Sequence, residues 1–300
     1  MVKKTLHYLI TDPQGIYVDC TLGSGGHFQA IAESLKSDAV LIGFDEDKSA
    51  INYCKENFDI DQREFLYNTN FSNLKKTIYR AGYTKVNGIF FDLGISSMEI
   101  DDSGRGFSHS NNGPLDMRFS QDNQETAKSF INTASVALLE KVFREFGEER
   151  GSFRIAKAIY RSRQDQEIET TRQLRNIIAR SVTTPNMIKT LSRVFQAIRI
   201  YVNEELDVLK DALPQAVELL VKGGQAVLIS YHSLEDRIVK QFLKNESKDC
   251  ICPPEFPQCQ CDHKASIEIL TKKPIIPDSE EVKLNPRSRS AKLRAFRKKI

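Results

Sequence analysis

The pattern of apolar and polar residues over the first hundred positions alternates between strand-like runs and helix-like stretches. Short apolar runs predict four strands, Tyr17–Asp19, Val40–Asp45, Glu64–Tyr67 and Gly88–Asp92. The stretches between them predict three helices, Phe28–Leu35, Lys48–Asn57 and Asn73–Ala81. Strands and helices that alternate in this way form mainly parallel sheets covered on both faces. We therefore predict an α/β fold whose ligand site lies at the carboxyl ends of the strands.

This alternation breaks after the fourth strand. Residues 94–119 are rich in Gly, Ser, Asn and Asp, which is typical of an ordered loop or an active-site lid. Helix-like patterns follow with no strand between them, and their apolar residues recur at spacings of three and four, as at Leu191, Val194 and Ile198. We predict a sheet domain over residues 1–106, an inserted helical domain over 107–200, and the rest of the sheet domain over 201–300.

The strand and helix alternation resumes near residue 201. Asn203 is predicted to cap a helix that Gly223-Gly224 ends, with a kink at Pro214. Ala226–Ser230 then forms a fifth strand. No apolar run approaches the length of a membrane span and no signal peptide opens the sequence, so we expect a cytoplasmic protein without a membrane partner.

The charge of the chain is small in total but uneven along the sequence. The formal net charge is +3, yet residues 282–300 contain eight Lys or Arg residues and no acidic residue. Such a stretch is either a solvated end or an arm that follows a phosphate backbone. On the second interpretation, deletion of residues 287–300 should weaken RNA binding and leave cofactor affinity unchanged.

Four of the six cysteines form two C-x-C pairs, which His263 follows. They are Cys250, Cys252, Cys259 and Cys261. Four thiols and an imidazole could hold Zn²⁺ tetrahedrally, but C-x-x-C pairs are more typical of structural zinc than C-x-C pairs. We therefore expect reduced free thiols and assign no metal ligand, with zinc as the open alternative. Cys20 and Cys54 are expected to be packing residues.

The stretch Tyr17–His27 is the most specific local pattern. An apolar run ends in Asp19, a glycine-rich turn leads into a helix, and a second apolar run ends in Asp45. This is the strand–turn–helix–strand order of nucleotide-binding units. A dinucleotide fits poorly, because a G-x-G-x-x-G motif from Gly23 requires glycine where Phe28 stands, and Asp19 would repel a pyrophosphate. A ligand with a ribose, a cationic amino acid tail and no phosphate fits better, and S-adenosylmethionine has this description.

Polar residues after two further strands indicate chemistry on an amino group. Methylation of an exocyclic amine needs acceptors for its N–H groups and a linear arrangement of nitrogen, methyl carbon and sulfur. After the fourth strand, Asp92 and Ser97 are candidate acceptors, although Asp92 and Ser96 could equally cap a helix or a turn. After the fifth strand, Tyr231 could stack on a base and His232 could take up a proton, or the histidine could be structural. We name Asp92, Ser97 and His232 as the candidate catalytic residues.

Segments over nearly the whole sequence resemble, in the same order, the bacterial 16S ribosomal RNA cytosine N4-methyltransferase family. The matching stretches are Tyr17–His27, Leu41–Asp47, Phe91–Ser97, Asp101–Arg118, Gly147–Arg150, Val194–Leu206, Ile229–Val239 and Asn285–Arg294. The resemblance implies a Rossmann-like class I methyltransferase sheet domain with an inserted all-helical domain that recognises the substrate. It also implies that S-adenosyl-L-methionine is used to methylate a decoding-centre cytosine, position 1402, in 16S rRNA.

The resemblance further implies where the cofactor binds. The expected contacts, with Asp19 at the end of the first strand included, are Asp19, Gly25, Gly26, His27, Asp45, Phe71, Asp92 and Glu99. Asp45 would hold the ribose hydroxyls, and Phe71 would lie near the adenine. The family usually has Pro-Gln where this chain has Met98-Glu99, and the carboxylate of Glu99 can accept a hydrogen bond but cannot donate one.

Three classes of function fit these patterns. The first is a methyltransferase that acts on an RNA base, the second one of the same fold that acts on a small molecule or a protein, and the third a nucleotide-binding or assembly protein without catalysis. The basic stretch and the large inserted domain favour a macromolecular substrate, and the strand-end acids argue against an inactive site. We expect 16S rRNA within the small ribosomal subunit as the partner, and the oligomeric state, a homodimer included, stays open.

Overall fold

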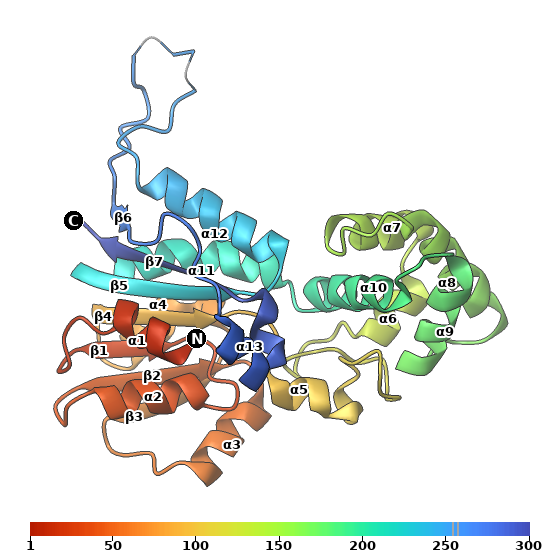
Figure 1. Ribbon diagram of the computed structural model, residues 1–300, viewed down its shortest axis with the longest axis horizontal. Helices are drawn as coiled ribbons and strands as arrows, with labels where there is room; N and C mark the ends of the chain where they lie inside the picture. Colours follow the sequence, from red (N-terminus) through yellow and green to blue (C-terminus); the bar gives the residue numbers. More distant parts are fainter. Residues whose placement is uncertain (254, 257) are drawn as a thin grey trace. The chain divides into compact units, whose positions relative to one another are not determined.

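Figure 1 shows the computed structural model, which describes residues 1–253, 255–256 and 258–300. The chain divides into two compact units, one formed by Met1–Gly94 with Leu206–Ile300 and the other by Ile95–Glu205. The second unit starts before the expected limit of residue 107, because Ile95 packs against the apolar core that contains Phe107 and Leu115. It ends after the expected limit of residue 200, because its last helix continues to Val202.

The first unit is built on a seven-stranded sheet with the order β3-β2-β1-β4-β5-β7-β6. The strands are β1 Ile16–Asp19, β2 Val40–Asp45, β3 Glu64–Asn68, β4 Val86–Asp92, β5 Leu220–Ser230, β6 Ile267–Ile269 and β7 Lys292–Lys298. β1 to β5 run parallel, whereas β7 is antiparallel to both of its neighbours, β5 and β6. The predicted α/β fold with a mainly parallel sheet is confirmed, and so are the four early strands.

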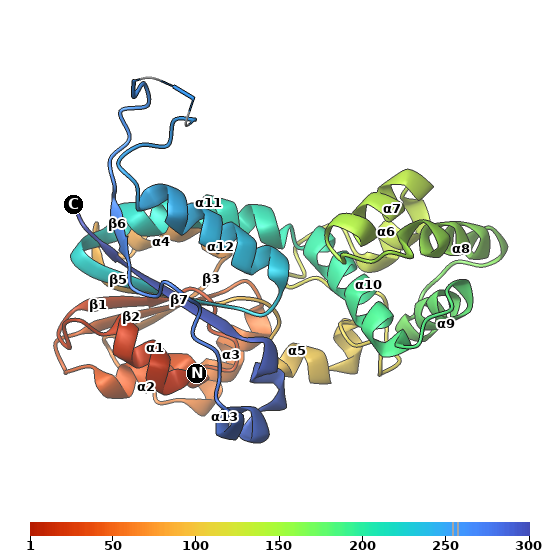
Figure 2. The same ribbon diagram turned by 45° about the horizontal axis from the view of Figure 1, so that its top comes forward.

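Helices cover both faces of this sheet, as Figure 2 shows. The helical segments of the unit are α1 Val2–Leu9, α2 Gly26–Ser34, α3 Lys48–Asn57, η1 Phe71–Asn73, α4 Leu74–Arg80, α11 Glu205–Leu219, α12 Ser233–Glu246, α13 Ser279–Leu284 and η3 Pro286–Ser290. Successive strand residues face opposite sides of the sheet. Val18 and Ile42 pack with α4, α11 and α12, whereas Tyr17 and Leu41 pack with α1, α2 and α3. β1 and β2 are apolar runs up to their terminal Asp because both of their faces are buried.

The second unit, drawn from yellow to green in Figure 1, is helical. Its elements are α5 Ser97–Asp101, η2 Ser103–Arg105, α6 Ala127–Thr133, α7 Val136–Glu145, α8 Ser152–Asp165, α9 Thr171–Ser181 and α10 Met187–Val202. The predicted apolar stripe of α10 is confirmed, since Leu191, Val194 and Ile198 are buried in the core of the unit. Among the described residues of the whole chain, no helix is both long and apolar enough to cross a membrane.

The prediction that Asn203 caps the following helix is wrong. Asn203 ends α10, and its side chain is buried. Its Nδ2 donates to the Met117 carbonyl oxygen at 2.8 Å, and its Oδ1 accepts from the Phe119 N–H at 2.8 Å. An amide offers both a donor and an acceptor, so this residue satisfies two backbone groups of the preceding loop instead of the next helix.

The prediction that Gly223-Gly224 ends a helix is also wrong. α11 ends at Leu219, and both glycines lie inside β5. Gly223 has a φ of +83°, and a Cβ atom on Gly224 would lie 2.9 Å from the carbonyl oxygen of Asn87 on β4. The two glycines therefore allow an irregular stretch of strand, where the pairing of β4 with β5 shifts register.

The basic stretch at residues 282–300 is neither a solvated end nor a free arm, because β7 lies within it and pairs with β5 and β6 inside the sheet. Three residues of β7 are fully buried, namely Leu293, Ala295 and Phe296. The side chain of Arg294 is buried as well, and its Nε donates to Oδ1 of Asp236 at 2.7 Å. Deletion of residues 287–300 would remove an internal strand, so we expect it to destabilise the sheet unit and not to change RNA binding alone.

Candidate active site

Three acidic residues end neighbouring strands at one edge of the sheet. Asp19 ends β1, Asp45 ends β2 and Asp92 ends β4. β1 pairs in parallel with both other strands, so the three carboxyl ends meet at the same edge. Ligands of open α/β sheets bind at this edge. The structure therefore brings together three of the side chains that the sequence assigned to the site.

The turn between β1 and α2 depends on glycine. Gly25 has a φ of +78°, and a Cβ atom there would lie 2.3 Å from Cε2 of Phe58 and 2.9 Å from Sγ of Cys54. A Cβ atom on Gly26, the first residue of α2, would meet nothing within 4 Å. The backbone at the start of α2 is therefore accessible to a ligand, and the N–H groups of a helix N-terminus favour a carboxylate such as that of an amino acid.

Asp45 is oriented by two backbone N–H groups. Its Oδ2 accepts a hydrogen bond from Gly23 at 2.7 Å, and its Oδ1 accepts one from Asp47 at 2.8 Å. Burial raises the pKa of Asp45 to about 6, against the lowering effect of these two hydrogen bonds. Each oxygen keeps a second lone pair, so the carboxylate can accept hydrogen bonds from two ribose hydroxyls without reorienting.

Asp19 is fully buried, and one of its oxygens has no partner. Its Oδ1 accepts a hydrogen bond from the Thr21 N–H at 3.0 Å, whereas no described residue bonds to the buried Oδ2. Burial raises the pKa of this carboxyl to about 7. An incompletely paired carboxylate is costly in an apolar environment, and a cationic group beside it would offset that cost. The orphan oxygen therefore fits the ammonium group of an amino acid ligand.

The side chain of Asp92 contacts both His27 and Tyr231, which lie far apart in the sequence. Its Oδ2 lies 3.2 Å from Nδ1 of His27, and its Oδ1 accepts a hydrogen bond from the Tyr231 hydroxyl at 2.9 Å. The Asp92 backbone N–H donates to Oγ1 of Thr21 at 2.6 Å, which joins β4 to the glycine-rich turn. Burial, together with the neighbouring Asp92 charge, raises the pKa of Tyr231, so the phenol stays protonated and donates. The carboxylate retains lone pairs that can accept hydrogen bonds from an amino group.

Two aromatic rings line the same edge of the sheet. The His27 ring, in the first turn of α2, packs on Phe90 with 4.7 Å between ring centroids, and no described residue bonds to its buried Nε2. The Phe71 ring, in the turn after β3, meets Phe91 edge to face at 5.6 Å. Phe71 is only partly buried, so it offers an apolar surface for a planar group such as adenine.

His232 caps α12 and pairs with an acid of the same helix. Its Nδ1 accepts a hydrogen bond from the Glu235 N–H at 3.4 Å, and its Nε2 lies 3.0 Å from Oε1 of Glu235. Oε2 of Glu235 accepts from the Tyr231 N–H at 2.9 Å. The sequence pattern alone assigns Glu235 no role in the site, although a polar residue followed three positions later by Glu is the spacing of a capping box. His232 therefore has a structural role as the N-cap of α12, which was the alternative to a proton acceptor.

Ser97 and Glu99 lie at the start of α5, in the helical unit. Ser96 and Glu99 form a capping box, in which Oε2 of Glu99 accepts from the Ser96 N–H at 2.8 Å. Ser97 is the first residue of the helix and is exposed. The box needs only an acceptor at position 99, so a Glu in place of the family's usual Gln keeps this local structure.

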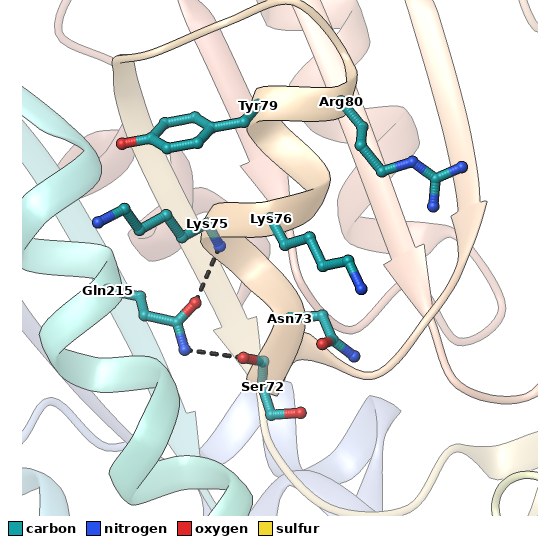
Figure 3. Close-up of a pocket in the computed structure, with 7 residues that line it drawn as sticks. All are labelled: Ser72, Asn73, Lys75, Lys76, Tyr79, Arg80 and Gln215. Carbon is teal, nitrogen blue, oxygen red and sulfur yellow. Dashed lines mark hydrogen bonds between the residues drawn. The ribbon is translucent and has the colours of Figure 1, made fainter.

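A separate groove of about 620 Å³ runs along α4 (Figure 3). Its lining residues are Ser72, Asn73, Lys75, Lys76, Tyr79, Arg80 and Gln215. Gln215 joins α11 to α4, since its Oε1 accepts from the Lys75 N–H at 2.9 Å and its Nε2 donates to the Ser72 carbonyl oxygen at 2.7 Å. Lys76 and Arg80 point away from Gln215 and are exposed. The groove contains none of the strand-end acids and lies outside the candidate active site.

The strand order, the glycine-rich turn after β1 and the acids at the ends of β1, β2 and β4 define a class I methyltransferase. The chain belongs to the MraW methylase family, whose family model matches residues 1–299. It is therefore an enzyme that uses S-adenosylmethionine as its methyl donor. The orphan oxygen of Asp19, the oriented carboxylate of Asp45 and the open start of α2 fit the ammonium, ribose and carboxylate groups of that donor.

Relatives of similar length share the name "Ribosomal RNA small subunit methyltransferase H". The protein from Halothermothrix orenii is 42% identical over 297 residues, which cover 98% of this chain and 96% of the relative. The protein from Clostridioides difficile is 40% identical over 302 residues, which cover 99% of this chain and 97% of the relative. A relative from Dehalococcoides mccartyi is 47% identical over 296 residues and covers 98% and 84%. The similarity therefore includes the helical unit as well as the sheet.

Replacement of Asp45 tests the ribose contact. Asp45→Ala should weaken S-adenosylmethionine binding by about 1.5–3 kcal/mol, because two hydroxyls lose a charged acceptor. Calorimetric titration measures the change, and Asp59→Ala, at an exposed position, is the control that should bind like the unmodified chain. Unchanged affinity in Asp45→Ala would mean that the ribose binds elsewhere.

The pH dependence of cofactor binding tests the two buried acids. Affinity should fall as the pH drops through about 7 and then about 6, because Asp19 and Asp45 hold a cation and hydroxyls best when ionised. In the ligand-free protein the sign is opposite: raised carboxyl pKa values favour the protonated folded state, so stability is lost as the pH rises towards about 7.

Titrations between about pH 5 and about pH 8 measure this dependence. Asp19→Asn should bind weakly throughout and lose the step near pH 7, since the titrating group is gone. A flat profile for the unmodified chain would contradict the assignment of these two acids to the donor.

Proposed function

We propose that the enzyme methylates the N4 amino group of a decoding-centre cytosine in 16S rRNA, within the small ribosomal subunit of the bacterial cytoplasm. The shared name of relatives that are at least 40% identical over almost the whole chain supports ribosomal RNA as the substrate. The ordered family segments noted in the sequence support cytosine N4 as the target atom.

The observation that carries this proposal is the position of Asp92. The residue ends β4 next to the glycine-rich turn and is fixed by Thr21, His27 and Tyr231. An acceptor so constrained suits an exocyclic amino group, whose two hydrogens must be held while its nitrogen attacks. Because the acceptor is already fixed, little energy is needed to reorient it in the transition state.

Different residues of the site bind the cofactor and orient the substrate. S-adenosylmethionine supplies, when bound, an electrophilic methyl group on a positively charged sulfur. Asp19, Asp45 and the start of α2 hold its amino acid and ribose groups, and Phe71 lies against the adenine. Asp92 accepts a hydrogen bond from the N4 amino group, which increases electron density on the nitrogen and aligns its lone pair with the methyl carbon.

Ser97 and His232 are the other proposed catalytic groups. Ser97 is the first residue of α5 and its side chain is exposed, so its hydroxyl is accessible as a hydrogen-bond acceptor. Nδ1 of His232 accepts the cap hydrogen bond of α12 and Nε2 lies near Oε1 of Glu235, so the ring takes up a proton from the amino group at Nδ1, and the cap hydrogen bond from the Glu235 N–H is lost when it does so. Glu235 would then stabilise the charged imidazole.

The helical unit is proposed to recognise the RNA. α8 packs against α9, and the two helices carry six exposed cations. These are Arg154, Lys157, Arg161, Arg172, Arg175 and Arg180. α9 has no acidic residue, so its surface suits a phosphate backbone, which binds cations in a way that depends on salt.

Charge removal on α9 tests this surface. Arg172→Ala with Arg175→Ala should weaken binding to small ribosomal subunits and lower the slope of log K against log salt concentration by up to about 2, one for each lost phosphate contact. Lys240→Ala with Lys244→Ala, both exposed on α12, removes the same charge and is the control. Equal effects of the two variants would mean that only net charge matters.

The decisive experiment for the activity is methyl transfer to purified small subunits and to free 16S RNA, with the modified nucleoside identified by mass spectrometry. We expect N4-methylated cytidine at a single nucleotide. Asp92→Asn should lower kcat by about a hundredfold, because the charged acceptor is lost. Methylation of another nucleoside would overturn the proposed specificity for cytosine N4. Methylation of protein alone would overturn RNA as the substrate and favour a methyltransferase of the same fold that acts on a protein.

A further inference from the structure

The connection from α12 to β6 gathers four thiols. Cys250, Cys252, Cys259 and Cys261 each place Sγ within 4.8 Å of the other three. The Cys259 and Cys261 sulfurs are 3.6 Å apart, and those of Cys250 and Cys261 are 3.8 Å apart. Four thiolates around Zn²⁺, each at about 2.3 Å from the metal, are about 3.8 Å from one another in a tetrahedron. The spacing of the sulfurs is therefore that of a zinc site.

Backbone donors point at two of these sulfurs. The Ile251 N–H, inside the first C-x-C pair, donates to Sγ of Cys261 at 3.4 Å. The Gln260 N–H, inside the second pair, donates to Sγ of Cys252 at 3.3 Å. A backbone N–H group of each C-x-C turn thus donates a hydrogen bond to a cysteine sulfur of the other turn. Hydrogen bonds of this kind orient metal ligands and stabilise the thiolate form that binds a metal.

The same geometry separates the four cysteines from His263. Nε2 of His263 lies 3.1 Å from the Asn245 carbonyl oxygen at the end of α12, and the imidazole does not belong to the sulfur group. The sequence left a mixed set of thiols and imidazole open. The structure selects a set of four thiols, which is a complete tetrahedral coordination without an open position for a substrate.

The location of the four-thiol cluster indicates a structural role. β5 ends at the active-site edge, and α12 starts there and returns to the opposite edge. β6 has the direction of β5, because β7 is antiparallel to both, so β6 also starts at that opposite edge. Figures 1 and 2 show the connection extending beyond α12 and β6. A metal that closes this long connection would order it without touching the catalytic groups.

We propose that Cys250, Cys252, Cys259 and Cys261 bind one structural Zn²⁺. The proposal is independent of the proposed substrate. It is tested on the full chain, purified under reducing conditions without chelator and incubated with Zn²⁺, by elemental analysis. Exchange with Co²⁺ then reports coordination through the absorption spectrum. We expect about one zinc per chain and the spectrum of a tetrahedral cobalt tetrathiolate.

Two variants define the ligand set. Cys252→Ser with Cys259→Ser should lose the metal and keep its affinity for S-adenosylmethionine, which shows that the sheet unit is folded. His263→Gln should keep both metal and spectrum. The proposal is overturned if the unmodified chain takes up less than about a tenth of one zinc per chain, if mass spectrometry finds disulfides among these cysteines under reducing conditions, or if His263→Gln loses the metal.

Discussion

Carboxylates held out of water at one edge of a parallel sheet are the constraint on which the methyltransferase unit depends. Asp19 and Asp45 are buried deeply enough to raise both of their pKa values, and the backbone N–H groups of the β1–α2 turn and of the segment after β2 only partly compensate. The left-handed backbone at Gly25 is needed to shape that turn. The site is thus costly when empty, and a cationic donor with two hydroxyls would offer the missing partners.

The sheet could be predicted from the sequence where its strands are apolar on both faces and alternate with helices, as β1 to β4 do. β7 could not, because Lys292, Arg294 and Arg297 make it look like a charged, solvated end. Its burial depends on distant partners, such as Asp236 for Arg294 and the edge of β5, and no local period reveals these. The roles of Asn203 and of Gly223-Gly224 cannot be predicted from the local pattern for a similar reason. Asn203 bonds to the carbonyl oxygen of the distant Met117, and Gly224 lies against Asn87 of β4.

The candidate site also has some features that the local sequence pattern predicts and others that only the structure reveals. The position of Asp19, Asp45 and Asp92 at one edge follows from the strand pattern alone, because parallel strands share an edge. The link of Asp92 to His27 and Tyr231 joins three segments and needed the structure. Likewise, the cysteine spacing named the four thiols but could not show that the two C-x-C turns face each other.

The place of β7 between β5 and β6 has a consequence for biosynthesis. The ribosome makes β5 before β6 and β6 before β7, and among the described strands β6 is hydrogen-bonded to β7 alone. The nascent chain therefore exposes a long apolar strand edge at β5 until the segment from Lys292 onwards has emerged. Incomplete chains that stop short of it would present that edge to one another and would be prone to aggregate or to be degraded.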